Sequence, residues 1–338
     1  MKKGICIAGN LVVDITYPIE KWPKESELVT ITEGITRSIG GAVCNDIVDL
    51  AKFDPTMPLQ TLGIIGNDSE GDYILEELAK HKNIDTSPLK RERITSFTAV
   101  MSNNESKNRT FFHHRGANAH FDESYIDWDK VSADIFHIGY ILLLDQLDKQ
   151  DEQYGTRMAR LLHNAQQKGL KTSIDVVSES GDRFKKIVSP ALKYTDYCVI
   201  NELEAQQVTD VLLRDNDEKL HPENMEEALK KLKGLGVSTW VVIHCPEGSF
   251  CLDENDNYLA VPSLCIPKED IKGTVGAGDA FCAGILYGAW KEWSIKDSVR
   301  LATCSAAAAL SERGATEGLS SVENVMKLEE KYSLREGF

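Results

Sequence analysis

The sequence predicts an α/β protein built on a doubly wound, mostly parallel central sheet. Apolar runs of strand length recur along the chain, among them KTSIDVV (171–177), YCVIN (197–201) and TWVVIHC (239–245). Strands covered by helices on both faces are apolar almost throughout, and several of these runs have that character. Helical patterns separate them, an alternation typical of parallel strands joined by crossover helices.

The other elements follow the same rhythm within one domain spanning residues 1–338, with no internal repeat or linker. We expect further strands at GICIAGN (4–10), PLQTLGIIG (58–66) and DIFHIGY (134–140). The whole opening segment, MKKGICIAGNLVVDI, is predicted to form a single first strand. Helices are predicted at 69–82, 150–168, 202–213, 223–235, 279–292 and 296–312, with another around DIVDLAKF (46–53).

Two segments break this rhythm and predict a small separate β-layer. They are LVTITEGIT (28–36) and the pair SFTAVMSN (96–103) and NRTFFHHRG (108–116), which alternates around a polar turn at 103–107. We expect antiparallel strands there, within segments of roughly 15–38 and 94–119. Such a layer could form a lid over one end of the domain, the alternative being an ordinary surface hairpin.

Composition excludes several classes of protein. The 338 residues carry 38 basic and 53 acidic side chains, a net charge of −15, which opposes general binding to nucleic acid or anionic lipid. Eight cysteines occur without a C-x-x-C motif, as expected in a reducing cytoplasm, and no apolar run reaches the roughly 20 residues of a membrane span. We therefore expect a cytoplasmic protein.

The most informative motif is GTVGAGDAFCAGILYGAW (273–290), a glycine-rich turn that runs into a helix. Gly276, Ala277 and Gly278 would leave backbone N–H groups at the helix start, where they can stabilise charge on a phosphoryl group. Asp279 follows immediately and could accept a proton from an attacking hydroxyl. The structural alternative is that Asp279 caps its helix and the glycines only turn the chain.

Two further motifs carry polar groups suited to ligands. GGAVCN (40–45) combines adjacent glycines, which admit a ligand close to the backbone, with the amide of Asn45, and Asp14 could hold two neighbouring hydroxyls of a sugar. Alternatively, the glycines form a turn and Asp14 caps a loop. NELE (201–204) follows a strand, so Asn201 and Glu204 could support Mg²⁺, although Asn-x-x-Glu is also a helix capping box.

Other nucleotide and metal motifs are absent from the sequence. No Gly-Lys dipeptide occurs, which excludes a Walker A loop, and GAGDAF has Phe281 where a dinucleotide fingerprint needs its third glycine. His113 and His114 are adjacent on a predicted strand, so they point to opposite faces and cannot share a metal.

In this order, the motifs resemble the ribokinase-like, or PfkB-type, carbohydrate kinases over essentially the whole chain. The landmarks are GNLVVD (9–14), GGAVCN (40–45), RGAN (115–118), NELE (201–204), GTVGAGD (273–279) and AAAALSERGA (306–315). The resemblance implies a central parallel sheet, a β-lid that closes over the sugar and often contributes to dimerisation, and ATP and Mg²⁺ as cosubstrates.

Residue roles follow from the resemblance by position. Asp279 would be the catalytic base and Gly276, Ala277 and Gly278 the anion hole, while magnesium and the triphosphate would be supported by Asn201 and Glu204. The acceptor would contact Asn10, Asp14, Gly40, Gly41 and Asn45, with Arg109 and Arg115 as lid contacts to an acidic or phosphorylated substrate, or else as surface residues of the lid. The nucleotide side would also include Gly248, Thr274 and Thr303.

The chain departs from the family pattern at three places. Gly273 and Val275 replace the aspartate that usually opens the glycine-rich motif and a frequent threonine. The neighbourhood of that aspartate often forms a monovalent-cation site, so potassium activation is not carried over. IHCPEG (243–248) retains only Gly248 of the family's nucleotide loop, and Thr303 stands where asparagine is frequent. Recognition of adenine can therefore differ.

The sequence thus predicts an ATP-dependent kinase that phosphorylates a primary hydroxyl of a small sugar or sugar acid. A nucleoside kinase of the same fold is an alternative, because GNLVVDI also resembles adenosine-kinase-like openings. A sugar-binding regulator without turnover is a second alternative. An oxidoreductase is disfavoured because the dinucleotide fingerprint is absent.

Overall fold

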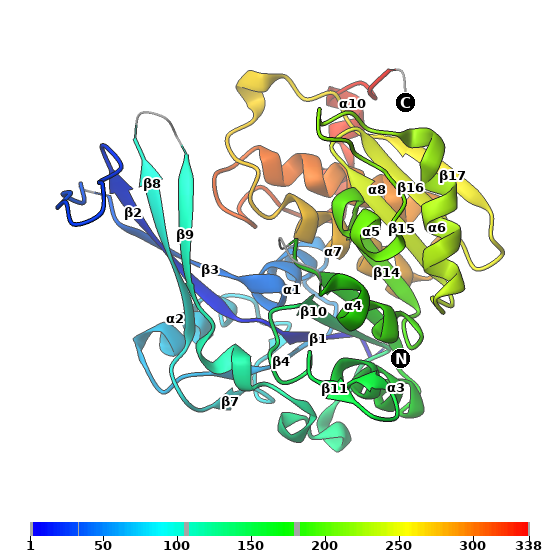
Figure 1. Cartoon of the computed structure of the whole chain (residues 1–338), viewed down its shortest axis with the longest axis horizontal. Coiled ribbons are helices and arrows are strands. Elements are labelled where there is room, and N and C mark those ends of the chain that lie inside the picture. The colour runs from blue at the N-terminus through cyan, green and yellow to red at the C-terminus, as the bar shows by residue number, and fades with distance from the viewer. Residues whose placement is uncertain (1–2, 33, 105–107, 179–182, 337–338) are drawn as a thin grey trace.

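A nine-stranded sheet forms the centre of the computed structural model, which describes residues 3–32, 34–104, 108–178 and 183–336 (Figure 1). Its strand order is β17-β16-β15-β14-β13-β10-β1-β4-β6. The pairs from β15 across to β6 are parallel, and the hairpin of β16 and β17 adds an antiparallel edge. This architecture confirms the predicted fold class.

The strands of this sheet are β1 (Ile5–Gly9), β4 (Leu59–Leu62), β6 (Ile84–Asp85), β10 (Ile135–Ile141), β13 (Lys171–Val176), β14 (Tyr197–Asn201), β15 (Trp240–Cys245), β16 (Gly248–Leu252) and β17 (Tyr258–Pro262). Two short ladders lie apart from it, β5 (Ile64–Ile65) with β7 (Lys90–Arg91) and β11 (Gln150–Asp151) with β12 (Gly155–Thr156).

The α-helices are α1 (Gly41–Phe53), α2 (Ser69–Leu78), α3 (Arg157–Gln167), α4 (Phe184–Leu192), α5 (Glu202–Thr209), α6 (Met225–Gly234), α7 (Ala277–Lys291), α8 (Ile295–Leu310), α9 (Val322–Met326) and α10 (Leu328–Lys331). Most coincide with the predicted helices. The expected helix at 150–168 begins only at Arg157, because Gly155 has φ 87° and residues 150–156 form the β11–β12 ladder.

Helices cover both faces of the sheet, which makes three layers. Along β15, Val242 packs into a core shared with α1, α7 and α8, whereas Val241 and Ile243 pack into a second core shared with α3 to α6. Because side chains of a strand alternate between faces, the apolar run of β15 fills both cores. This double burial explains why the central strands lack polar alternation.

The segments predicted to form the lid build a four-stranded sheet that projects from one end of the domain, called the lid below (Figure 1). Its order is β3-β2-β8-β9, with β2 (Val12–Ile19), β3 (Thr36–Gly40), β8 (Ser96–Asn103) and β9 (Arg109–His114). β2 and β8 are parallel, while β3 and β9 are antiparallel to their neighbours. The predicted separate β-layer is therefore present, although residues 105–107 of the predicted turn lie outside the described residues.

Two details of the predicted strands are wrong. The opening segment is not one strand, because β1 ends at Gly9 and β2 begins at Val12 and enters the lid. The segment 28–36 forms no strand among its described residues beyond an isolated bridge between Ile19 and Ile31, and β3 begins only at Thr36. Leu28 is 90% exposed, so the apolar side chain that begins this alternating segment does not pack against a sheet.

No helix within the described ranges is both long and apolar enough to cross a membrane.

Candidate active site

Asp279 lies in the first turn of α7, directly after a tight glycine turn. Gly276 is the N-cap of α7 and has φ 79°, a left-handed conformation that favours glycine. A Cβ on Gly276 would also lie 2.4 Å from the carbonyl oxygen of Ala315, in the run of 306–315. The end of the 306–315 run thus packs closely against Gly276, while Gly278 in the first turn of α7 is exposed. The first backbone N–H groups of α7 can therefore face an anion.

The carboxylate of Asp279 is held by two side chains from other elements. Asn45 Nδ2 on α1 donates a 2.7 Å hydrogen bond to Oδ2, and the Tyr140 hydroxyl on β10 donates a 2.7 Å hydrogen bond to Oδ1. Burial raises the pKa of Asp279, while these two hydrogen bonds act in the opposite direction. Asp279 is the third residue of α7 and its oxygens are bonded elsewhere, so it does not serve as the helix cap.

The double glycine joins the lid to α1 and brings Asp14 close to the helix start. A Cβ on Gly40 would lie 2.6 Å from Asp14 Oδ2, and Gly41, with φ 83°, would place one 2.5 Å from the carbonyl oxygen of Asn10. Asp14 lies within β2 and does not cap a loop. Burial raises its pKa, whereas a hydrogen bond with the Thr98 side chain and the charge of Arg109 lower it.

Asn10 supports the site through backbone contacts. Its Oδ1 accepts a 2.6 Å hydrogen bond from the Tyr140 backbone N–H, and its Nδ2 donates to the Leu143 carbonyl at 3.4 Å. The side chain is only 1% exposed. The predicted acceptor residues Asn10, Asp14, Gly40, Gly41 and Asn45 are thus connected to Asp279 through α1 and Tyr140.

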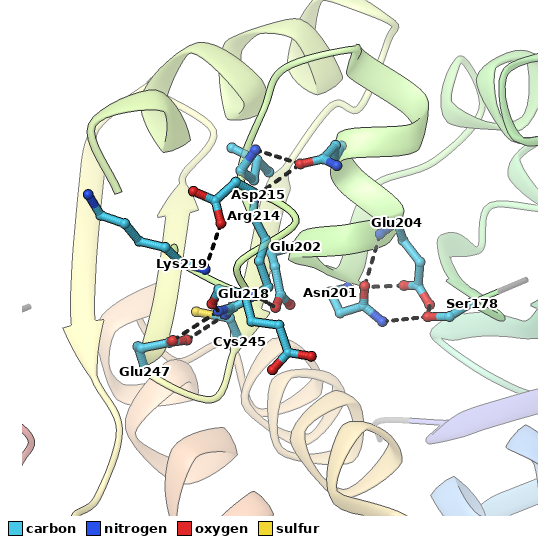
Figure 2. Close-up of polar contacts among 12 residues, drawn as sticks. Ser178, Asn201, Glu202, Glu204, Arg214, Asp215, Glu218, Lys219, Cys245 and Glu247 are labelled. Carbon is cyan, nitrogen blue, oxygen red and sulfur yellow. Dashed lines mark hydrogen bonds and ion pairs between the residues drawn. The ribbon is translucent and has the colours of Figure 1, made fainter. Parts of the chain in front are cut away.

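Asn201 and Glu204 form the capping box that the sequence allows, at the start of α5 (Figure 2). Asn201 Oδ1 accepts from the Glu204 N–H at 2.9 Å, and Glu204 Oε2 accepts from the Asn201 N–H at 3.0 Å. The Ser178 hydroxyl donates to Glu204 Oε1 at 2.7 Å and accepts from Asn201 Nδ2 at 2.9 Å. Burial raises the pKa of Glu204 to about 7.

The same pair is chemically suited to a divalent cation. Within the described part of the chain, no cationic side chain pairs with the Glu204 carboxylate, although Arg214 nearby neutralises Glu202 and Glu247 (Figure 2). A buried carboxylate beside an amide oxygen is a donor set that Mg²⁺ accepts. The capping role of Asn201 and Glu204 therefore does not exclude metal binding by the same pair.

His244 connects the capping box to the glycine turn. It is the register partner of Asn201 across β14 and β15, and a Cβ on Gly278 would lie 3.6 Å from its Cε1. The ring stacks on Phe281 of α7 at a centroid distance of 4.9 Å, and burial lowers its pKa to about 4. A neutral imidazole therefore lines the region between these two motifs.

The other predicted nucleotide residues are more dispersed. Thr274 is exposed in the turn before α7, Gly248 is buried at the start of β16, and Thr303 is 8% exposed within α8. α8 packs closely on α7, since a Cβ on Gly284 would lie 2.5 Å from Ala302 Cα. The two side-chain hydrogen bonds to the Asp279 carboxylate come from Asn45 and Tyr140 and not from these three residues.

The two predicted lid arginines differ in their surroundings. Arg109 is exposed on β9, and its charge reaches Asp14. Arg115 follows β9 and donates to the Asp145 carboxylate and to the Leu142 carbonyl. Arg109 is therefore available to a ligand, whereas Arg115 is bound to the loop after β10.

Sequence reasoning missed three residues of this region: Tyr140, Ser178 and His244. Each lies at or just beyond the carboxyl end of a parallel strand, where α/β sheets place their ligands. All three strands were predicted, so that rule could have identified the residues.

Comparisons with known proteins agree with this geometry. The family described as pfkB family carbohydrate kinase matches residues 2–322. A ribokinase of Arabidopsis thaliana is 23% identical over 332 residues, which cover 96% of this chain and 80% of that protein.

Two solved structures have the same fold. The structure of Arabidopsis thaliana ribokinase complexed with ribose and ATP has a TM-score of 0.78 at 21% identity, covering 97% of this chain and 99% of that one. The nucleoside kinase of Methanocaldococcus jannaschii, an archaeal member of the ribokinase family, has a TM-score of 0.71 at 18% identity, covering 97% and 98%. The chain belongs to the pfkB family of carbohydrate kinases, phosphotransferases with an alcohol group as acceptor.

Proposed function

We propose that this protein transfers the γ-phosphoryl group of ATP to a primary hydroxyl of a small sugar or sugar acid. The observation that supports this most directly is the Asp279 carboxylate, fixed by Asn45 and Tyr140 at the N-terminus of α7. The carboxylate can accept the hydroxyl proton while the N–H groups after Gly276 stabilise charge on the transferring group. The ribose and ATP bound to the Arabidopsis ribokinase are consistent with this assignment.

In this proposal, the sugar binds under the lid between Asp14 and Asp279. Asp14 and Asn45 would bind sugar hydroxyls, and the lid would exclude water from the transferring group. Positioning and electrostatic stabilisation provide most of the catalysis, because phosphoryl transfer leaves little covalent work for side chains. Asn201 and Glu204 would hold Mg²⁺, directly or through its waters, and the ion would neutralise charge on the nucleotide phosphates.

The acceptor can be found by measuring coupled ADP release across a panel of sugars, sugar acids and nucleosides. The panel is run with wild type, with Asp279→Asn and with Asp297→Asn. Asp297 is the matched control because it occupies the third position of α8, as Asp279 does in α7, and accepts a hydrogen bond from Ser294. We expect one acceptor class to give turnover that only Asp279→Asn abolishes.

Other outcomes of the panel select other functions. A nucleoside as the best acceptor would favour the nucleoside kinase alternative, which the similarity to the Methanocaldococcus enzyme keeps open. Thermal stabilisation by a sugar without ADP release would indicate a binding protein. A preference for sugar acids that is lost in Arg109→Gln would assign the exposed lid arginine to the acid group.

We also propose that the lid can mediate a homodimer. β9 is an edge strand whose residues are all exposed, and Phe111 and Phe112 are 60% and 58% exposed. An exposed edge with apolar side chains is a surface that a second copy can cover. Sedimentation velocity should give a dimer for wild type and a monomer for Phe111→Ser/Phe112→Ser, and a wild-type monomer across concentrations would contradict the proposal.

A further inference from the structure

A second group of potential ligands lies in the core behind Asp279. Asp46 on α1, His137 on β10 and Cys282 on α7 place one carboxylate oxygen, one ring nitrogen and the thiol sulfur within 4.8 Å of one another. The three residues are 0%, 0% and 1% exposed. They come from three separate elements and have no assigned role in the phosphoryl transfer proposed above.

Three polar atoms of this cluster have no hydrogen-bond partner within the described chain. They are the two carboxylate oxygens of Asp46 and the Nε2 of His137. All three atoms are buried, and none forms a hydrogen bond to any described residue. Asp46 Oδ2 and His137 Nε2 are 3.1 Å apart, yet their orientation does not meet hydrogen-bond geometry. Leaving a carboxylate buried in this way is costly, and a cation among the three residues would remove the cost.

The distance between Asp46 and His137 fits two ligands of a tetrahedral metal centre. Two oxygen or nitrogen ligands about 2.0–2.1 Å from a metal, at a tetrahedral angle, are roughly 3.3 Å apart, close to the observed 3.1 Å. His137 Nδ1 is 3.0 Å from the Ser173 hydroxyl oxygen. A hydrogen bond at that nitrogen fixes the ring and directs Nε2 toward the cluster, as the outer partners of metal-bound histidines do.

We propose that Asp46, His137 and Cys282 bind one transition-metal ion, and that zinc is the ion they suit best. A thiolate and an imidazole are ligands that zinc accepts, whereas Mg²⁺ and Ca²⁺ require sets of oxygen ligands. The second Asp46 oxygen is also unpartnered, so the carboxylate is free to bind the ion through either oxygen. Burial raises the pKa of the free Cys282 thiol, so the thiolate forms with loss of its proton as the metal binds.

The role of this ion is structural. Asp46 follows Asn45 in the sequence, and Cys282 lies one turn of α7 beyond Asp279. The metal would therefore fasten α1 to α7 directly behind the Asn45–Asp279 hydrogen bond. This inference does not rest on the proposed reaction, because that reaction assigns no role to any of the three ligands.

The test is the metal content of the full chain, purified from cells grown with added zinc and measured by plasma mass spectrometry. We expect about one zinc ion per chain in wild type and in the control Cys251→Ala, and roughly a tenth or less in Cys282→Ala. Cys251 is a matched control, since it is 0% exposed on β16 and outside the cluster. Refolding wild type with Co²⁺ should produce a thiolate-to-cobalt charge-transfer band that Cys282→Ala lacks.

Several results would overturn the inference. Wild type that purifies without a transition metal and takes up neither zinc nor cobalt on refolding would show Asp46 and His137 to be a metal-free acid–imidazole pair. Equal metal content in Cys282→Ala and wild type would exclude the site even if metal is present. If Cys282→Ala does not fold, Cys282→Ser takes its place, because serine keeps the size of the side chain but gives no thiolate-to-cobalt band. A band in Cys282→Ser equal to that of wild type would reject Cys282 as the ligand. Asp279→Asn should retain the metal, which separates this test from that of the reaction.

Discussion

The Tyr140 hydroxyl donates a 2.7 Å hydrogen bond to Oδ1 of Asp279, and Asn45 donates to the other oxygen. Both oxygens of the proposed base are therefore engaged before any substrate binds. Because a carboxylate oxygen has two lone pairs, the substrate hydroxyl can approach an oxygen that already accepts one bond. Tyr140 and Asn45 thus orient the carboxylate without blocking it.

Tyr140→Phe should shift the pH dependence of turnover. The hydroxyl lowers the pKa of Asp279, so its removal lets the pKa rise further. A base works only when deprotonated, so the acid limb of the kcat/KM profile should move to higher pH. On that limb we expect a loss of about 10-fold or more. The control is Tyr125→Phe, which removes a hydroxyl that donates to Glu92 at the surface. An acid limb at the wild-type position would contradict the role given to Tyr140.

Gly40→Ala should weaken sugar binding while leaving the protein folded. The new Cβ would lie 2.6 Å from Asp14 Oδ2, so the Asp14 side chain must move away from its site. Loss of one hydrogen bond to a charged group should raise the KM for the sugar about 10- to 100-fold with a smaller change in kcat. Gly234→Ala is the control, since its Cβ would meet nothing within 4 Å. A sugar KM equal to that of the control would show that Asp14 does not bind the acceptor.

Glu204→Gln should separate capping from metal binding. Glutamine can still accept from the Asn201 N–H, so the free energy of unfolding should change little, whereas Glu204→Ala should cost about 1 kcal/mol. Loss of the charge should raise the Mg²⁺ concentration needed for half-maximal turnover at fixed ATP in both variants. Urea unfolding and a Mg²⁺ titration measure the two effects. An unchanged Mg²⁺ requirement in Glu204→Gln would show that Glu204 caps α5 but does not bind the metal.

Asp148→Asn should remove a pH-dependent loss of stability. Burial raises the pKa of Asp148 from 3.8 to about 6, so the folded protein binds this proton more tightly than the unfolded chain. The stabilisation by the proton is complete below about pH 4 and is lost as pH rises through about 6, a difference of at most about 3 kcal/mol. Asparagine resembles the protonated acid and can keep the bond from the Leu142 N–H.

Urea unfolding of both proteins between pH 4.5 and 7.5 measures this effect. The stability of wild type relative to Asp148→Asn should fall as pH rises across that interval. A constant difference would mean that Asp148 ionises normally in the folded protein.

The parts of the site that could be predicted from sequence are those in which neighbouring residues act together. Gly276 to Asp279 and Asn201 to Glu204 are contiguous, and their local geometry follows from turn and capping chemistry. The contact of Tyr140 with Asp279 joins residues 139 positions apart, and only the packing of β10 against α1 and α7 creates it. No local sequence pattern predicts a contact between residues so far apart in the chain.

The errors in the fold have a related origin. Alternation at 28–36 reports a preference for extended backbone, but a strand also needs a partner, and the partners of β2 are β3 and β8. The first apolar run covers β1 and β2 without a gap, because Asn10 and Leu11 are also buried. Burial continues through the point at which the chain leaves the main sheet, so hydrophobicity cannot mark that point.

If the ligand binds between Asp14 and Asp279 as proposed, that junction would couple binding to motion of the lid. Asp14 belongs to a lid strand and Asp279 to the body of the domain, with only Asn10 and Leu11 between β1 and β2. A ligand that needs both carboxylates binds fully only when the lid is positioned over the sheet. Its measured affinity then includes the free energy of closing the lid. That affinity equals the affinity for the closed form multiplied by the fraction of molecules already closed. Residues of the lid that never touch the sugar would thus contribute to how tightly the protein holds it.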